Sequence, residues 1–189
     1  MSFTEMTGQP CVGKTTFISQ EIRAGKGFQM YVQRYPMKFY CFFLGINYLG
    51  FKRARILFSW SLKESASFLF RINVFFNAVT KFGFPSKLNI SLQESSPPYL
   101  VDEGLSHIPF LFLNTDTRRV VEFIAVEVRN ANVLFLKSPG CDVIQDRLGK
   151  RGHKRLKFLS IPHFVQRNQE IENILLSLYP SLCKKIEIY

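Results

Sequence analysis

One eight-residue pattern near the beginning of the chain restricts its fold more than any other feature. Residues 8–15 match the pattern GxxxxGK[ST], with the sequence Gly8-Gln9-Pro10-Cys11-Val12-Gly13-Lys14-Thr15. Glycines at these positions let the backbone turn tightly, so that successive N–H groups face one anion, and a following helix adds its positive N-terminal end. Because a strand is expected at 3–7 and a helix from Lys14 to Ala24, the context fits a phosphate-binding loop, or P-loop.

This loop predicts the binding of a nucleoside triphosphate, taken as ATP, together with Mg²⁺. Residues 8–15 and the next helical residue, Thr16, are expected to hold the phosphates. Lys14 is expected to reach the β- and γ-phosphates, and the Thr15 hydroxyl to ligate the ion. The alternative is a glycine turn followed by an exposed lysine, but the strand and helix on either side favour the P-loop.

Two acids follow a second short apolar segment. Residues 99–104 predict a strand that ends in Asp102 and Glu103. A carboxylate at the end of such a strand is where a P-loop fold places its second Mg²⁺ contact, often through water. We therefore expect Asp102 to share the ion with Thr15, and Glu103 to be a second catalytic candidate. Taken alone, the two acids could equally open a surface loop.

The remaining pattern predicts an α/β fold. Residues 133–136 form an apolar run typical of a buried parallel strand, and Ser138-Pro139 predicts the N-cap and first turn of a helix through residues 141–150. Further helices are expected at 115–129 and 162–178, and further strands at 28–33 and 185–189. Alternating strands and helices predict a three-layer α/β/α P-loop NTPase fold in one domain, 1–189, with a mostly parallel five-stranded sheet.

The segment 142–155 is rich in cations and is expected to form a lid. Arg147 and Arg151 lie four residues apart and so share one helix face. Such a pair can clamp the charge that spreads over a γ-phosphoryl group during transfer. The alternative is a basic helix end that the helix dipole favours.

The strand at 133–136, the Ser138-Pro139 turn and the Arg147-xxx-Arg151-Gly152 pattern together resemble thymidylate kinases and deoxynucleoside kinases. The resemblance covers residues 1–30, 97–104 and 132–188, and it implies that Arg147 and Arg151 contact the transferred phosphate. Those relatives follow the acid of the third strand with an Arg that contacts the substrate phosphate, whereas this chain has Glu103-Gly104 instead. They also place a general-base Glu soon after the second strand, and here no acid lies between Glu21 and Glu64.

The middle of the chain, residues 34–96, lies outside the resemblance. It is expected to form a helical insertion of two or three helices on the substrate side. The net charge is +11, and between residues 22 and 101 eleven Lys or Arg stand against two acids. Such a surface suits an anionic acceptor or, because aromatic residues alternate with the cations, the surface of an anionic membrane. A buried aromatic core is the alternative. Candidate acceptor contacts are Arg34, Lys38, Arg53, Arg55 and Arg71.

Other compositional features narrow the function classes. The four cysteines are widely spaced, without a CxxC pair or a histidine at metal-ligand spacing, which argues against a disulfide framework or a zinc site. No apolar run approaches the length of a membrane span, and no leader precedes the loop, so we expect a cytoplasmic protein. Nucleic acid is not the expected partner. Nothing in the sequence predicts the oligomeric state.

These observations predict an ATP- and Mg²⁺-dependent kinase that transfers the γ-phosphate to a nucleoside, a nucleotide or another small, anionic acceptor. Lys14, Asp102, Glu103, Arg147 and Arg151 are its expected catalytic residues. A hydroxyl acceptor would need Asp102, Glu103 or Glu64 as its base. The alternative is a nucleotide-binding interaction protein or weak ATPase, associated with a membrane surface. A GTPase-type switch is disfavoured, since residues 114–117 lack the Lys of NKxD.

Overall fold

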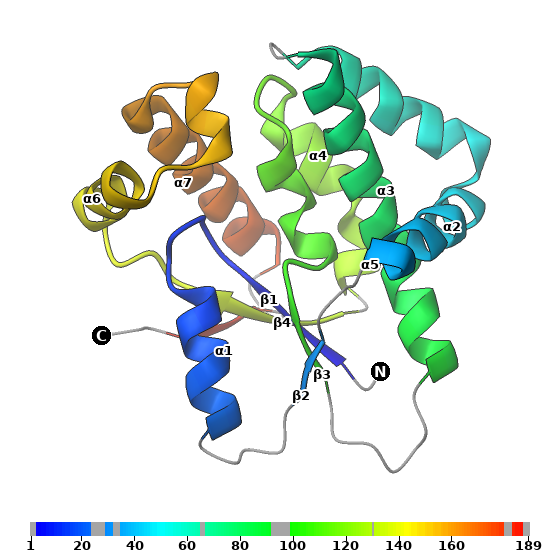
Figure 1. The fold of residues 1–189 in the computed structure, drawn as a ribbon, viewed down its shortest axis with the longest axis horizontal. Helices are drawn as coiled ribbons and strands as arrows, with labels where there is room; N and C mark the ends of the chain where they lie inside the picture. Colours follow the sequence, from blue (N-terminus) through cyan, green and yellow to red (C-terminus); the bar gives the residue numbers. More distant parts are fainter. Residues whose placement is uncertain are drawn as a thin grey trace.

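Five short strands lie side by side in a parallel sheet within the part of the chain that the structure describes (Figure 1). The structure is a computed structural model and describes residues 3–23, 29–31, 35–64, 67–91, 99–129, 131–179 and 183–186. The strand order is β2-β3-β1-β4-β5. The strands are β1 (Phe3–Thr7), β2 (Gln29–Tyr31), β3 (Tyr99–Asp102), β4 (Asn132–Leu136) and β5 (Cys183–Ile186).

The register of the central strands brings three carboxyl ends together. Met6 of β1 pairs with Asp102 of β3, and Thr7 pairs with Phe135 of β4. The loop that follows β1 therefore begins beside the last residues of both neighbouring strands. In open parallel sheets this edge is where ligands bind.

The helices form two groups in Figure 1, with α6 and α7 on the left and α2 to α5 on the right. Two short 3₁₀ helices are also described, η1 (Leu105–Leu111) between β3 and α4 and η2 (Lys154–Lys157) between α6 and α7. The helices are α1 (Lys14–Arg23), α2 (Tyr35–Leu62), α3 (Phe68–Ser91), α4 (Thr117–Phe123), α5 (Ala125–Arg129), α6 (Cys141–Arg151) and α7 (Ile161–Leu178).

Both faces of the sheet are covered, as β4 shows most clearly. Val133 and Phe135 belong to a hydrophobic cluster with α2, α3, α4 and η1, whereas Leu134 and Leu136 pack with α1 and α6. Successive side chains of a strand point to opposite faces of the sheet. The predicted α/β architecture with a parallel sheet is therefore confirmed, and helices lie on both sides of it.

The predicted helical insertion consists of two long helices, α2 and α3, that pack closely against each other. Two glycines make this contact possible, because a Cβ at Gly83 would lie 1.8 Å from the Cys41 carbonyl oxygen, and one at Gly45 would lie 2.1 Å from that of Val79. At Gly50 the backbone leaves helical geometry, with φ at 66°, and α2 bends.

Some expected boundaries are wrong. The helix expected over 115–129 is broken at Ile124, where the chain turns so that Glu127 of α5 faces inward and accepts a hydrogen bond from Arg53 at 2.6 Å. The helix α6 begins after Gly140, whose φ of 120° suits a glycine, and not at Ser138. The last strand begins two residues earlier than expected, at Cys183, and the expected residues 187–189 lie outside the described part of the chain.

Three other expectations fall partly or wholly outside the described residues. These are the last residue of the first expected helix, Ala24, the ends of the strand expected at 28–33, and the loop expected at 95–98. Among the described residues no helix is long and apolar enough to cross a membrane.

The close contact between α2 and α3 generates a stability prediction. Gly83→Ala should lower the free energy of unfolding by at least about 1–3 kcal/mol, because the new methyl group overlaps a backbone carbonyl that cannot move alone. Gly149→Ala is the matched control. It lies inside α6 with nothing within 4 Å of its Cβ position, so it should raise stability by about 0.5–1 kcal/mol. Urea unfolding measures both, and equal effects would contradict the proposed contact.

Candidate functional site

The loop between β1 and α1 has the backbone geometry of an anion-binding nest. Gly8, Cys11 and Gly13 have positive φ angles of 145°, 64° and 108°. Cys11 adopts a conformation that is uncommon outside glycine, so the loop holds backbone strain. Gly8 also has no room for a side chain, since a Cβ there would lie 2.8 Å from the Leu136 carbonyl oxygen. A turn of this kind ending at a helix N-terminus favours negative charge.

The Lys14 side chain lies inside this loop, with 7% of its surface exposed. Its Nζ donates hydrogen bonds to the carbonyl oxygens of Gly8 and Gln9, both at 3.1 Å. The Glu103 carboxylate lies 3.8 Å from the same nitrogen. The Lys14 ammonium group is thus held inside the loop by two neutral carbonyl oxygens and the Glu103 carboxylate.

Asp102 and Glu103 stand beside the start of the loop, where the β1–β3 register places them. The Glu103 backbone N–H donates to the Met6 carbonyl oxygen at 3.1 Å, and its φ of 61° turns the chain sharply after β3. Oδ1 of Asp102 is buried and makes no hydrogen bond within the described residues. Burial raises the pKa of Asp102, as does the Glu103 charge, while Lys14 and Lys81 oppose the shift.

Two charged residues of this cluster, Lys81 and Glu5, were missed by sequence analysis. Lys81 reaches in from α3 and donates a hydrogen bond to the Glu103 carbonyl oxygen. Burial lowers the pKa of Lys81, while the charges of Glu103, Glu5 and Asp102 raise it. No local pattern marks Lys81 as a site residue, because α3 joins the sheet edge only through the tertiary fold.

Glu5 points from the middle of β1 into the space beside Gly104. Its Oε2 accepts hydrogen bonds from the backbone N–H and the hydroxyl of Ser106, at 3.1 and 2.9 Å. A Cβ at Gly104 would lie 2.2 Å from the Glu5 carboxyl carbon. The Glu5 carboxylate therefore occupies the space that a side chain at residue 104 would need. An acid in the middle of a short apolar strand is the one sequence feature that could have drawn attention to Glu5.

His107 of η1 adds an imidazole to the same cluster. The ring is buried, stacks on Phe110 with centroids 5.1 Å apart, and places Nε2 at 3.4 Å from the Glu103 carboxylate. Glu103 is therefore oriented from two sides, by Lys14 and by His107.

Arg147 extends from α6 onto the outside of the loop. Its Nη1 donates to the carbonyl oxygens of Cys11 and Val12, at 3.1 and 3.3 Å. A pocket of about 500 Å³ opens between the loop, α1 and α6. Arg151 also lines this pocket, together with Cys11, Val12, Gly13, Thr16, Phe17, Gln20, Arg147 and Lys150.

Glu172 of α7 holds the loop in place through hydrogen bonds. The Gln9 amide Nε2 donates to Glu172 Oε2 at 2.7 Å, and the Ser138 backbone N–H donates to the other oxygen at 3.4 Å. Glu172 thus joins the segment after β1 to the segment after β4. No sequence pattern predicts the contact between Gln9 and Glu172, because these residues are 163 positions apart in the chain.

The other expected site residues divide into two groups. Thr15 and Thr16 are exposed in the first turn of α1, and Thr16 faces the pocket. Glu64 and Arg53 are engaged elsewhere. Glu64 is buried and accepts hydrogen bonds from the backbone N–H groups of Leu113 and Asn114, at 2.8 and 3.2 Å. Glu64 therefore has a structural role, and the hypothesis that it acts as a base is not supported by its contacts.

Arg53 also makes structural contacts. Its guanidinium binds Glu127 and the Phe123 carbonyl oxygen, and lies 4.6 Å from the centre of the Phe123 ring. Arg55 is exposed on α2, and Arg34 lies outside the described residues. The expected acceptor contacts at these positions remain predictions.

The burial of Glu5 generates a pH prediction. Burial raises the pKa of Glu5 above its usual value of 4.5, so the folded state retains a proton that the unfolded state has lost. Glu5→Gln keeps the shape and removes the titration. As pH rises above 4.5, the variant should gain stability relative to the wild type, by at most ~1.4 kcal/mol per pH unit. Thermal unfolding across pH measures this, with the exposed Glu170→Gln as control. A stability difference independent of pH would contradict it.

The comparisons with known proteins found a structural likeness but no match in sequence. No family model matches the sequence, and no curated protein matches it. The fold is similar to the structure of deoxyadenosine kinase from M. mycoides with bound dATP, at 16% identity and a TM-score of 0.46. The alignment covers 97% of this chain and 90% of that chain.

Proposed function

We propose that this chain is an ATP- and Mg²⁺-dependent kinase of the thymidylate kinase and deoxynucleoside kinase-like group, acting on a small, anionic acceptor. The observation that carries the proposal is the convergence of Lys14, Asp102, Glu103 and Arg147 on the loop at residues 8–13. These residues come from α1, the end of β3 and α6, and they supply the cations and carboxylates that phosphoryl transfer requires.

The nucleotide binds with its phosphates along the loop. The backbone N–H groups of the nest and the N-terminus of α1 receive the phosphate oxygens. Lys14 leaves the carbonyl oxygens of Gly8 and Gln9 for the β- and γ-phosphates, because a charged acceptor binds an ammonium group more strongly than neutral carbonyls do. The pocket of about 500 Å³ beside Thr16 is large enough for the sugar and base.

The residues at the loop fit a magnesium ion. Asp102 Oδ1 is buried without a hydrogen-bond partner in the described part of the chain, and the Thr15 hydroxyl stands at the start of α1. No group of three His, Cys, Asp or Glu that could hold a metal occurs among the residues described. Mg²⁺ usually keeps several waters and shares its remaining positions with phosphates, so one carboxylate and one hydroxyl suffice as protein ligands. The ion supplies charge neutralisation at the β- and γ-phosphates.

The transfer itself needs positioning and charge more than acid–base chemistry. An acceptor oxygen attacks the γ-phosphorus while the bond to the β–γ bridging oxygen breaks, and ADP leaves with that electron pair. Arg147, now on the Cys11 and Val12 carbonyl oxygens, turns toward the phosphoryl oxygens as their charge spreads. Arg151 contacts the same group from the next turn of α6.

Lys81 takes the place of the missing arginine on the acceptor side. The chain has Glu103-Gly104 where the relatives carry that Arg, whereas Lys81 brings a cation to the end of β3 from another element. An ammonium group beside Asp102 and Glu103 favours an acceptor that carries its own negative charge. For such an acceptor little base catalysis is needed.

Transfer of label from γ-labelled ATP tests the proposed function. The protein is incubated with pools of nucleosides, nucleoside monophosphates and phosphosugars, and a labelled small molecule is expected in a pool of anionic acceptors. Lys14→Ala should reduce this labelling at least a hundredfold, and Lys52→Ala, an exposed lysine on α2, should not. If label appears only as inorganic phosphate and Lys14→Ala stops its release, the chain is a weak ATPase and the kinase proposal fails.

The role of Lys81 has its own test. Lys81→Met should raise the KM of the labelled acceptor about ten- to hundredfold, the loss expected for a charge-assisted hydrogen bond, while the affinity for ATP stays within a fewfold of wild type. Lys81→Arg should restore most of the acceptor affinity. Steady-state kinetics and ATP titration measure the two effects. If kcat falls with the acceptor KM unchanged, Lys81 does not bind the acceptor.

A further inference from the structure

The hairpin of α2 and α3 exposes an unusual amount of apolar surface. Phe51 is 83% exposed, Leu69 79% and Phe43 68%. Most of the exposed large hydrophobic side chains of the described residues lie on these two helices, and those elsewhere are Val126, Val143 and Leu178. Large exposed apolar patches on a protein mark an interaction site.

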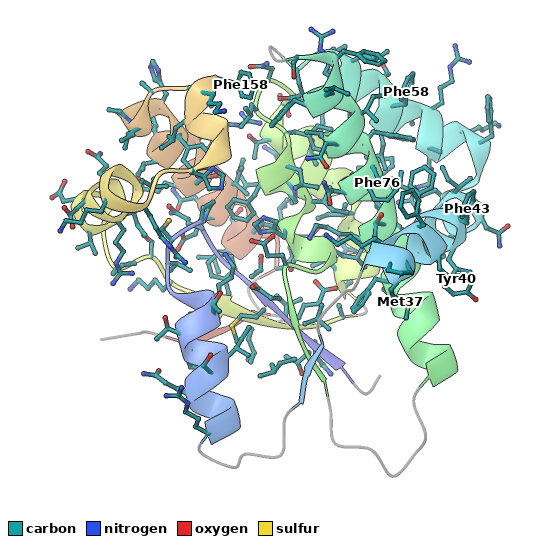
Figure 2. All side chains as sticks on the ribbon, viewed as in Figure 1. Met37, Tyr40, Phe43, Phe58, Phe76 and Phe158 are labelled. Carbon is teal, nitrogen blue, oxygen red and sulfur yellow. The ribbon has the colours of Figure 1, made fainter. Side chains whose placement is uncertain are left out.

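Three of the exposed rings, Phe39, Phe43 and Phe58, belong to one connected aromatic cluster. Phe42 of α2 stacks on Phe76 of α3 at 4.9 Å between ring centroids, and Phe39 and Phe43 adjoin them at 5.3 and 5.9 Å. Through Phe75 the cluster reaches Phe58 in the second half of α2, at 5.2 Å. Figure 2 shows Phe58, Phe76, Phe43 and Tyr40 following one another down the right side of the molecule. We use the name aromatic hairpin face for the surface of α2 and α3 that carries this cluster and the exposed side chains of Phe51 and Leu69.

The charge on the hairpin has a single sign. Glu64 is the only acid between residues 35 and 91, and it is buried against the backbone of Leu113 and Asn114. Lys52, Arg55 and Lys63 are exposed on or next to the second half of α2. Arg53 differs from them, because it turns inward to Glu127 of α5.

The acids on the neighbouring helices do not offset this charge. Glu127 of α5 is buried and paired with Arg53. Glu122 of α4 is exposed and paired with Arg118 on its own helix, at 3.1 Å. The exposed charges on the described part of the hairpin are thus all positive.

We propose that the aromatic hairpin face binds the surface of an anionic lipid membrane. Aromatic and aliphatic side chains enter the boundary between headgroups and acyl chains, and Lys and Arg pair with the anionic headgroups. A second copy of the chain fits this surface less well, since a symmetric contact would place cations of like sign against each other without an acid between them. The proposal does not depend on the kinase function.

Vesicle co-sedimentation with the whole chain tests the proposal. Phosphatidylcholine vesicles containing phosphatidylserine should bind the protein at low NaCl, and high NaCl or vesicles of phosphatidylcholine alone should weaken binding at least tenfold. The Lys52→Glu, Arg55→Glu variant should lose at least about thirtyfold in partitioning, since each cation near an anionic surface adds about a factor of five and the two new acids add repulsion. The Phe43→Ser, Phe51→Ser variant should lose at least tenfold.

A matched control carries the same kinds of change outside the hairpin. Val126→Ser with Arg129→Glu alters an exposed apolar residue and an exposed cation of α5 and should bind vesicles like the wild type. Thermal melting shows that each variant is folded. The proposal is wrong if wild type fails to bind anionic vesicles at low NaCl, or if the hairpin variants bind as well as the control. It is also wrong if sedimentation shows a dimer that the hairpin variants abolish, because a second copy then covers the face.

Discussion

The pairing of β1 with β3 is the constraint on which the rest of the structure depends. Its register sets Met6 against Asp102, so the loop that leaves β1 begins beside two acids from a segment almost a hundred residues away. The Glu103 backbone N–H continues this pairing by one further bond to Met6. Without that register, Lys14 would have only the loop carbonyls near it, and Asp102 would be one more acid at a strand end.

The charges at this edge are arranged to compensate one another. Three acids, Glu5, Asp102 and Glu103, lie with two lysines, Lys14 and Lys81, in partly or fully buried positions. Buried charges persist only when they are paired or hydrogen-bonded. Here each ammonium group is held by backbone carbonyl oxygens as well as by acids. Such acceptors release a lysine readily to a phosphate, which is how the proposed site changes from its free to its bound arrangement.

The features that could be predicted from the sequence are those that local patterns encode. The strand–loop–helix around Lys14, the apolar run of β4 and the helix that carries Arg147 each depend on neighbours within a few residues. Their arrangement as an α/β fold with a parallel sheet follows from the alternation of strands and helices. The placement of Asp102 beside the loop was inferred from where a P-loop fold puts a carboxylate at the end of a strand, and the register is consistent with it.

The features that were not predicted depend on contacts between distant segments. Lys81 reaches the site because α3 packs beside η1. The Glu5 carboxylate can extend to the end of β3 because Gly104 has no side chain in that space. Ile124 interrupts a regular helical pattern because tertiary packing of Glu127 and Arg53 outweighs local propensity. Glu64 was considered as a base since acids are scarce in its region, yet its partners are two backbone N–H groups. Hydrophobic spacing contains none of this information.

A crystal structure of the chain with Mg²⁺ and a non-hydrolysable ATP analogue would show directly whether the loop at residues 8–15 binds the phosphates of ATP. We expect the β- and γ-phosphates to lie within the loop at residues 8–15. Lys14 should have moved from the Gly8 and Gln9 carbonyl oxygens onto the phosphates. We also expect the ion between Thr15 and Asp102, and Arg147 near the γ-phosphate. An analogue bound elsewhere, or a Lys14 that stays on the loop carbonyls with the phosphates present, would contradict it.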